Sequence, residues 1–361
     1  AYDKVLFSAV MLLLICGVVM VYSSSSVVAL TSYNDPSYFM KRQILWALIG
    51  LTAMAAMMRF DHEKLGDKRV VAALLVVTLI LMIMTLLPVT GKMVNGARRW
   101  IRLPGPSFQP AELMKFALVV YVGSYISTKG DRLRDVTNGL VPCLVITGVF
   151  CGLAMVQPDF GTVMVTAIVL FIMLFAGCAK LSHLGAIVAI FAPLAIFAVA
   201  FKTYRIRRVL TFLDPWADPT GAGHQIVQSF LAFGSGGVFG RGLGEGRQKL
   251  LFLPERHSDF IYAVIGEELG IIGAAAVLFL FAVVLWRGMR IARQAHDSFS
   301  RMLALGITAL ISIQALINMA VVTGLMPTKG IALPLVSYGG SALLVTLASL
   351  GVLLNISRQT P

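Results

Sequence analysis

Residues 5–29 read VLFSAVMLLLICGVVMVYSSSSVVA, a stretch of 25 residues without a charged side chain. A helix that crosses the roughly 30 Å hydrocarbon core of a bilayer needs about 20 such residues. The stretch is also longer than the roughly 7 to 15 apolar residues of a signal-peptide core. We therefore interpret it as a retained membrane-spanning helix, and we expect the rest of the chain to repeat the pattern.

Further apolar runs do follow along the chain. Of the 361 residues, 58% are hydrophobic and 13% are charged, against about 25% charged in soluble domains, which excludes a soluble enzyme. The predicted fold class is an all-α polytopic integral membrane protein with about ten transmembrane helices, and residues 1–361 form one transmembrane domain. We place the spans near residues 5–29, 43–59, 70–89, 110–126, 138–156, 162–178, 184–203, 261–286, 302–325 and 341–357.

The charge balance predicts the orientation and the kind of partner. An even number of spans puts both termini on one side, where the connecting segments hold 14 Lys and Arg, against 7 in the short loops opposite. Positive charge favours the cytoplasmic side, so we expect cytoplasmic termini and an extracytoplasmic loop over residues 204–260, between spans seven and eight. The net charge of +13 indicates anionic lipid or an anionic substrate. No basic tract with interleaved aromatic residues supports nucleic-acid binding.

The long loop contains an amphipathic run at residues 226–231 and seven glycines between Gly234 and Gly246. The run suits a helix in the membrane interface. The glycines match neither a dinucleotide-binding motif nor a P-loop. Two interpretations stay open for them: a flexible connector, or a mobile lid whose backbone N–H groups approach phosphate.

Several kinds of site can be excluded. All four cysteines lie in apolar runs without a Cys-x-x-Cys pair, so we expect neither a disulfide framework nor a thiolate metal site. His257, Ser258 and Asp259 are adjacent, and adjacent side chains point too far apart to form a catalytic triad. No His-x-x-x-His pair exists, and we predict no dedicated metal site.

Ionisable residues near the outer ends of the spans are the remaining candidates, because charge at the membrane is costly and usually functional. Glu112 and Lys115 are three residues apart and can form an ion pair on one helix face, either structural or functional. Within span eight, Glu267 or Glu268 must face the bundle interior or water. Gln314 and Asn318 have the spacing of interhelical hydrogen-bond partners rather than ligands. The outer-end set is Arg42, Glu112, Lys115, Asp159, Glu255, Asp259 and Lys329.

Two functional classes fit these residues. A transporter needs ionisable groups near the bilayer midplane and usually has repeated halves. An enzyme acting on a lipid-linked phosphosugar needs a carboxylate base and cations gathered on one face. The charges gather on one face and no matching halves are found, which favours the enzyme.

Short motifs throughout the chain resemble those of the SEDS family (shape, elongation, division and sporulation). Residues 326–330 (MPTKG) and 94–101 (VNGARRWI) resemble the division branch more than the elongation branch. The family motifs are LPERHSDF at residues 253–260, AVIGEELG at 263–270, QPDFGT at 157–162, QPAEL at 109–113, FLDP at 212–215 and PLVSYGGS at 334–341.

The resemblance implies an inverting peptidoglycan glycosyltransferase of the bacterial cytoplasmic (inner) membrane at the division septum, which polymerises lipid II on the extracytoplasmic face. It implies that Asp259 is the general base, although an aspartate there could instead cap the eighth helix. The older flippase interpretation of the family is the alternative. No cofactor is evident, and a divalent cation could help to bind diphosphate. The candidate substrate-binding residues are Arg42, Trp100, Arg102, Glu112, Lys115, Asp159, Glu255 and Lys329.

The resemblance also implies protein partners. The expected partner is a class B penicillin-binding protein, an FtsI-like transpeptidase that cross-links the new strand. Other division membrane proteins, such as FtsQ, FtsL and FtsB, are expected in the same assembly.

Overall fold

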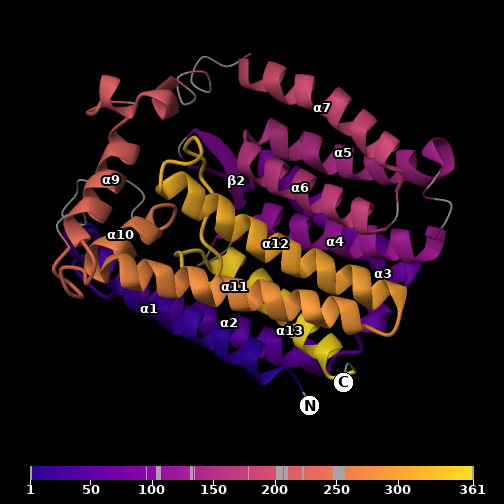
Figure 1. Ribbon diagram of the computed structural model, residues 1–361, viewed down its shortest axis with the longest axis horizontal. Helices are drawn as coiled ribbons and strands as arrows, with labels where there is room; N and C mark the ends of the chain where they lie inside the picture. Colours follow the sequence, from indigo (N-terminus) through magenta and orange to yellow (C-terminus); the bar gives the residue numbers. More distant parts are fainter. Residues whose placement is uncertain are drawn as a thin grey trace.

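The computed structural model describes residues 2–94, 96–102, 107–130, 133, 135–177, 179–200, 206, 210–221, 223–246 and 257–359. Long helices lie side by side, and a short hairpin and several loops gather at one end (Figure 1). The helices are α1 (Lys4–Tyr33), α2 (Tyr38–Arg59), α3 (Lys68–Leu86), α4 (Pro110–Lys129), α5 (Val141–Val156), α6 (Phe160–Ala176), α7 (Leu181–Ala200), α9 (His224–Gly236), α10 (Ile261–Glu268), α11 (Gly270–Gln294), α12 (Ser298–Val322) and α13 (Gly340–Ser357). Short helical turns are η1 (His62–Gly66), η3 (Val136–Leu140) and η4 (Pro215–Ala217), and β1 (Gly91–Val94) pairs antiparallel with β2 (Ala97–Ile101).

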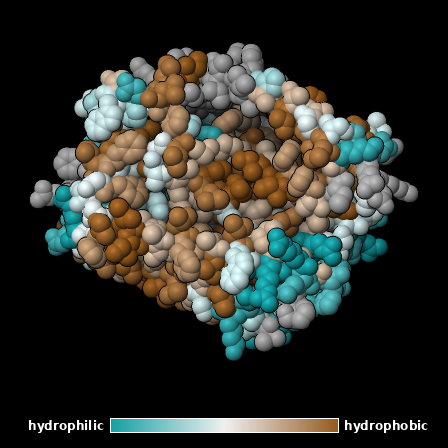
Figure 2. Space-filling model, viewed as in Figure 1, coloured by the Kyte–Doolittle hydropathy of each residue, from teal (hydrophilic) through white to brown (hydrophobic). Residues whose placement is uncertain are grey.

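In the residues that the structure describes, each predicted apolar run coincides largely with a helix, which confirms an all-α, multi-pass membrane fold. In the described part of the chain, five helices are long and apolar enough to cross a membrane: α1, α3, α11, α12 and α13. The count of ten spans stays a prediction. Figure 2 shows apolar side chains over the middle of the visible face and a hydrophilic patch at the end where both termini lie in Figure 1.

The core of the bundle is formed by α4 and α12, whose side chains are nearly all buried. They pack against each other, and α12 also packs against α6 and α11. By contrast, α3 and α11 leave much of their apolar surface exposed, as lipid-facing helices do. The C-terminal end of α12 is therefore a fixed point on which surrounding loops can be held.

The predicted eighth span is wrong in one respect, because it is two helices. Leu269 separates α10 from α11, and Gly270 has a φ of 70°. The N–H groups of Arg241 and Gly242 donate to the carbonyls of Glu267 and Glu268, each at 3.0 Å. The glycine-rich segment thus supplies hydrogen bonds at the break in the helix.

Close backbone packing explains the glycines at this break. A Cβ on Gly240 would lie 2.2 Å from the Glu268 carbonyl oxygen, and one on Gly270 would lie 2.3 Å from the Gly240 nitrogen. Real Cβ contacts are never this short, so only glycine fits. Up to Gly246, the segment therefore packs against the broken span, and several of its N–H groups donate within the protein. Those of Arg241 and Gly242 are already used within the protein.

Both carboxylates of the broken span face the interior, as the sequence predicts for at least one of them. Glu267 and Glu268 are fully buried. Glu268 accepts hydrogen bonds from the Ser23 hydroxyl at 2.6 Å and from the Gly244 N–H at 3.1 Å. This carboxylate joins α1, the glycine-rich segment and α10.

The amphipathic run at residues 226–231 lies on a helix, α9, whose place in the membrane interface stays a prediction. Ile226 and Val227 are buried, and α9 packs against α10. The Ser229 hydroxyl donates to the Val322 carbonyl at 2.6 Å, which ties α9 to the end of α12. The protein core buries this helix face because α10 offers it a matching apolar surface.

Candidate functional site

Asp259 lies in a turn of residues 257–260 that leads directly into α10. The helix begins at Ile261, with Phe260 in the N-cap position and no side-chain cap. Asp259 therefore lies one position before the N-cap of α10 rather than in the cap position itself. Its side chain is partly exposed.

The loop between α12 and α13, residues 323–339, holds this turn in place. A Cβ on Gly330 would lie 3.1 Å from Asp259 Oδ2, so the carboxylate lies against the loop backbone. The Asn318 side-chain amide donates to the Asp259 carbonyl at 2.8 Å and to the Ile331 carbonyl at 2.7 Å. The Tyr338 N–H donates to the His257 carbonyl at 2.9 Å. The turn is therefore fixed by contacts near both ends of the loop.

Lys329 directly precedes the glycine that faces Asp259. Its ammonium group contacts the Met164 sulfur and lies 4.9 Å from the centre of the Phe160 ring. A cation over an aromatic face is attracted by the ring quadrupole. Burial lowers the pKa of Lys329. The partly desolvated Lys329 cation and Gly330, which faces the Asp259 carboxylate, are therefore adjacent residues of one loop.

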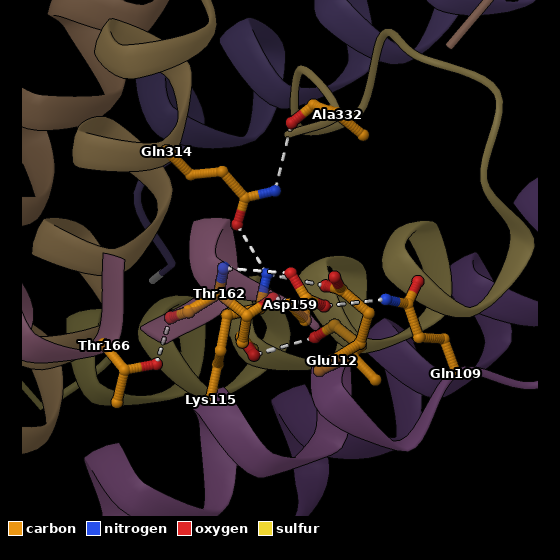
Figure 3. A network of polar contacts seen from close by, with 10 residues as sticks. Gln109, Glu112, Lys115, Asp159, Thr162, Thr166, Gln314 and Ala332 are labelled. Carbon is orange, nitrogen blue, oxygen red and sulfur yellow. Dashed lines mark hydrogen bonds and ion pairs between the residues drawn. The ribbon is translucent and has the colours of Figure 1, made fainter. Parts of the chain in front are cut away.

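Glu112 and Lys115 form the ion pair that their spacing predicts, at 2.9 Å, and both side chains are almost fully buried. Lys115 also donates to Gln314 Oε1 at 2.7 Å, and Gln314 donates to the Ala332 carbonyl at 3.0 Å. Figure 3 shows Lys115 between Glu112 and Gln314, with Ala332 at the far end of the chain of contacts. The pair therefore supports the loop from α4, through α12. Gln314 makes the interhelical hydrogen bond that its spacing predicts, whereas Asn318 bonds to a turn and a loop instead of a second helix.

Asp159 lies next to this network and caps α6 (Figure 3). Its carboxylate accepts from the Thr162 N–H at 3.2 Å and the Thr162 hydroxyl at 3.0 Å. Gln109, which precedes α4, donates to the same carboxylate at 3.5 Å. Both oxygens of Asp159 therefore hold the start of α6, the helix against which Lys329 rests.

Arg42 lies in an aromatic cluster that the sequence does not reveal. Its guanidinium is 4.7 Å from the centre of the Tyr38 ring. The Phe39 ring lies 4.9 Å from His257 and 5.2 Å from Tyr338. Burial raises the pKa of Tyr338, although the nearby Arg42 opposes the shift. The cluster places Arg42 near the turn that carries Asp259, and the only sequence signal for it is the tyrosine within the SYGG motif.

The remaining predicted residues are not joined to this site by the described contacts. Trp100 pairs with Lys92 in the hairpin, and the Arg102 N–H donates to the Thr90 carbonyl at 2.9 Å. Instead, Arg99 reaches the turn before α6, donating to the Gln157 carbonyl at 3.0 Å. Glu255 lies outside the described residues.

The arrangement combines one accessible carboxylate with cations from three elements. Asp259 can accept a proton, and Lys329 and Arg42 can bind an anion beside it. The charge of Lys115 is already balanced by Glu112, and Lys115 supports the loop before α13 through Gln314. Within the described ranges, no three side chains of His, Cys, Asp or Glu group closely enough to hold a metal ion.

Sequence comparisons identify relatives over the whole chain. The cell cycle protein family model of FtsW, RodA and SpoVE matches residues 3–361. A Trichlorobacter lovleyi protein named probable peptidoglycan glycosyltransferase FtsW is 48% identical, over 99% of this chain and 93% of that protein. Stage V sporulation protein E of Bacillus subtilis is 42% identical, over 99% of this chain and 97% of that protein.

Solved structures show the same fold. A chain from a peptidoglycan synthase complex that coordinates polymerization and crosslinking has a TM-score of 0.81 and 29% identity, covering 99% of this chain and 98% of its own. The crystal structure of the rod-shape-determining protein RodA from Thermus thermophilus has a TM-score of 0.73 and 26% identity, covering 100% of this chain and 98% of its own.

Proposed function

The chain belongs to the cell cycle protein family of FtsW, RodA and SpoVE, and from this premise we propose that it is a peptidoglycan glycosyltransferase that polymerises lipid II with Asp259 as general base. One observation carries the proposal. The Asp259 carboxylate belongs to a partly exposed residue just before α10 and lies against the loop that carries Lys329. The names of the relatives support the reaction class.

The proposed reaction forms a β-1,4 bond from an α-linked sugar diphosphate. The acceptor 4-hydroxyl oxygen attacks C1 of the donor from the side opposite the diphosphate, and the C1–O bond to the diphosphate breaks. Asp259 takes the hydroxyl proton as the new bond forms, which increases the nucleophilicity of the oxygen. The leaving polyprenyl diphosphate carries away the bonding electron pair. One base and suitably placed cations are sufficient for this inversion.

Cations near Asp259 would stabilise the charge that grows on the leaving group. Lys329 can supply a compact charge from the loop, and Arg42 can offer a planar donor from α2. We keep Trp100, Arg102 and Glu255 as proposed substrate contacts. Glu112, Lys115 and Asp159 would act by holding the loop and α6. A divalent cation could add to the positive charge, and the reaction as written does not depend on one.

The protein would work in the bacterial inner membrane at the division septum, with the site on the extracytoplasmic face. Its proposed partner is a class B penicillin-binding protein, and FtsQ, FtsL and FtsB would join the same assembly. The related synthase complex, which coordinates polymerization and crosslinking, supports such a partner.

Purified protein in vesicles that contain lipid II tests the reaction, with and without the penicillin-binding partner. We expect glycan strands, formed faster in the presence of the partner. Movement of lipid II between leaflets without polymer formation would overturn the proposed polymerase activity and favour a flippase instead.

A further inference from the structure

One buried amide joins the two parts of the proposed site. Asn318 lies on α12, is 2% exposed, and donates from a single nitrogen to the carbonyls of Asp259 and Ile331. Ile331 lies two residues after Lys329. The same NH₂ group therefore fixes the backbone at the proposed base and the backbone beside the proposed phosphate-binding cation.

The position of Asn318 makes this contact rigid. The residue lies near the outer end of α12, which is packed against α4, α6 and α11. One turn earlier, Gln314 holds the Ala332 carbonyl and is itself held by Lys115. Both amides thus lie on one face of a core helix and bond to consecutive residues of the same loop.

We propose that Asn318 is a positioning residue for glycosyl transfer, setting the separation between the Asp259 carboxylate and Lys329. The inference rests on the proposed function of Asp259. A displacement of about 1 Å in a reacting group can lower a rate by roughly 100-fold, so a donor that fixes two backbone segments at once has a direct effect on turnover. Asn318 does not touch the reacting atoms and acts through the residues that it holds.

The test replaces Asn318 with leucine, which keeps the branched shape at Cγ, is somewhat larger, and removes both hydrogen bonds. The control is Asn355→Leu near the end of α13, where the amide donates to the Met58 carbonyl at 2.7 Å and the oxygen faces His62. Both variants lose buried hydrogen bonds, so the thermal midpoint should fall for each. For Asn318→Leu we expect kcat to fall about 10-fold or more with KM for lipid II within about 2-fold, whereas Asn355→Leu should keep kcat.

A double-variant cycle separates this inference from the function on which it rests. If Asn318 acts through Asp259, the variant carrying both Asn318→Leu and Asp259→Asn should polymerise no more slowly than Asp259→Asn alone. Independent, multiplying losses would overturn the positioning role while leaving Asp259 as the base. Near-parental kcat in Asn318→Leu would also overturn it. Near-parental kcat in Asp259→Asn would overturn both.

Discussion

The surroundings of the Lys329 side chain favour its neutral amine over the charged ammonium form. It contacts Met164 and the Phe160 ring, and its pKa is lowered by burial. The charge is therefore lost as pH rises through a pKa below the usual value for lysine. If the charge binds diphosphate, the alkaline limb of the activity profile should reflect this loss.

Two variants of Lys329 test that expectation. Lys329→Ala should lose most polymerase activity. Lys329→Arg should keep part of it and stay active at alkaline pH where the parent declines, because a guanidinium does not deprotonate there. The measurement is kcat/KM for lipid II against pH. Normal turnover in the alanine variant would leave Lys329 as a residue that only reaches for lipid headgroups.

The residue-scale features that the sequence predicts are local ones. Glu112 and Lys115 are one helical turn apart, and their ion pair follows from that spacing. Contacts between residues far apart in the sequence cannot be predicted in this way. Asn318 reaches Asp259 across 59 residues, and Tyr338 meets His257 across 81, and no periodicity links such pairs. They depend on how α12 and its following loop return to the start of α10.

At the scale of elements, hydropathy locates the helices but misses the break between α10 and α11. The run from residue 261 to 286 is continuously apolar apart from two glutamates, so it reads as one span. The break depends on backbone packing of the glycine-rich segment against Gly270, and that contact lies outside any local pattern.

Gly270→Ala tests whether this packing holds the broken span. Its φ of 70° disfavours a side chain, and the new Cβ would overlap the Gly240 backbone. We expect a loss of about 2 kcal/mol or more, seen as a lower thermal midpoint and reduced polymerisation. The control is Gly148→Ala in α5, where a Cβ meets nothing within 4 Å and alanine favours the helix by about 1 kcal/mol. Equal thermal midpoints for the two variants would contradict the account.

At the scale of the whole molecule, the two ends of the bundle hold different features. Both termini lie at one end, and α10 with the proposed site lies at the other (Figure 1). The charge pattern predicts which end is cytoplasmic, whereas the residues that close the site come from α2, α6, α12, the turn before α10 and the loop before α13. The sequence identifies most of these segments as motifs but not how they meet.

Single cysteines test the orientation. In a version without the four native cysteines, Glu245→Cys at the proposed outer end should react with an impermeant maleimide in intact spheroplasts. His296→Cys, at the proposed cytoplasmic end, should react only after permeabilisation. Glu245 and His296 are both exposed in the structure, so burial does not prevent either cysteine from reacting. The reverse pattern would place the site in the cytoplasm.

The most direct test of the central claim is glycan polymerisation by Asp259→Asn. A neutral amide cannot accept the hydroxyl proton, so turnover should fall roughly 100-fold or more while folding and partner binding are kept. Asp297→Asn is the control, because Asp297 caps α12 by accepting from the Ser300 N–H at 2.8 Å and asparagine caps about as well. If Asp259 is the base, the first variant should lose most of its turnover and the second should change little. Lipid II polymerisation by Asp259→Asn within a few-fold of the parent would contradict it.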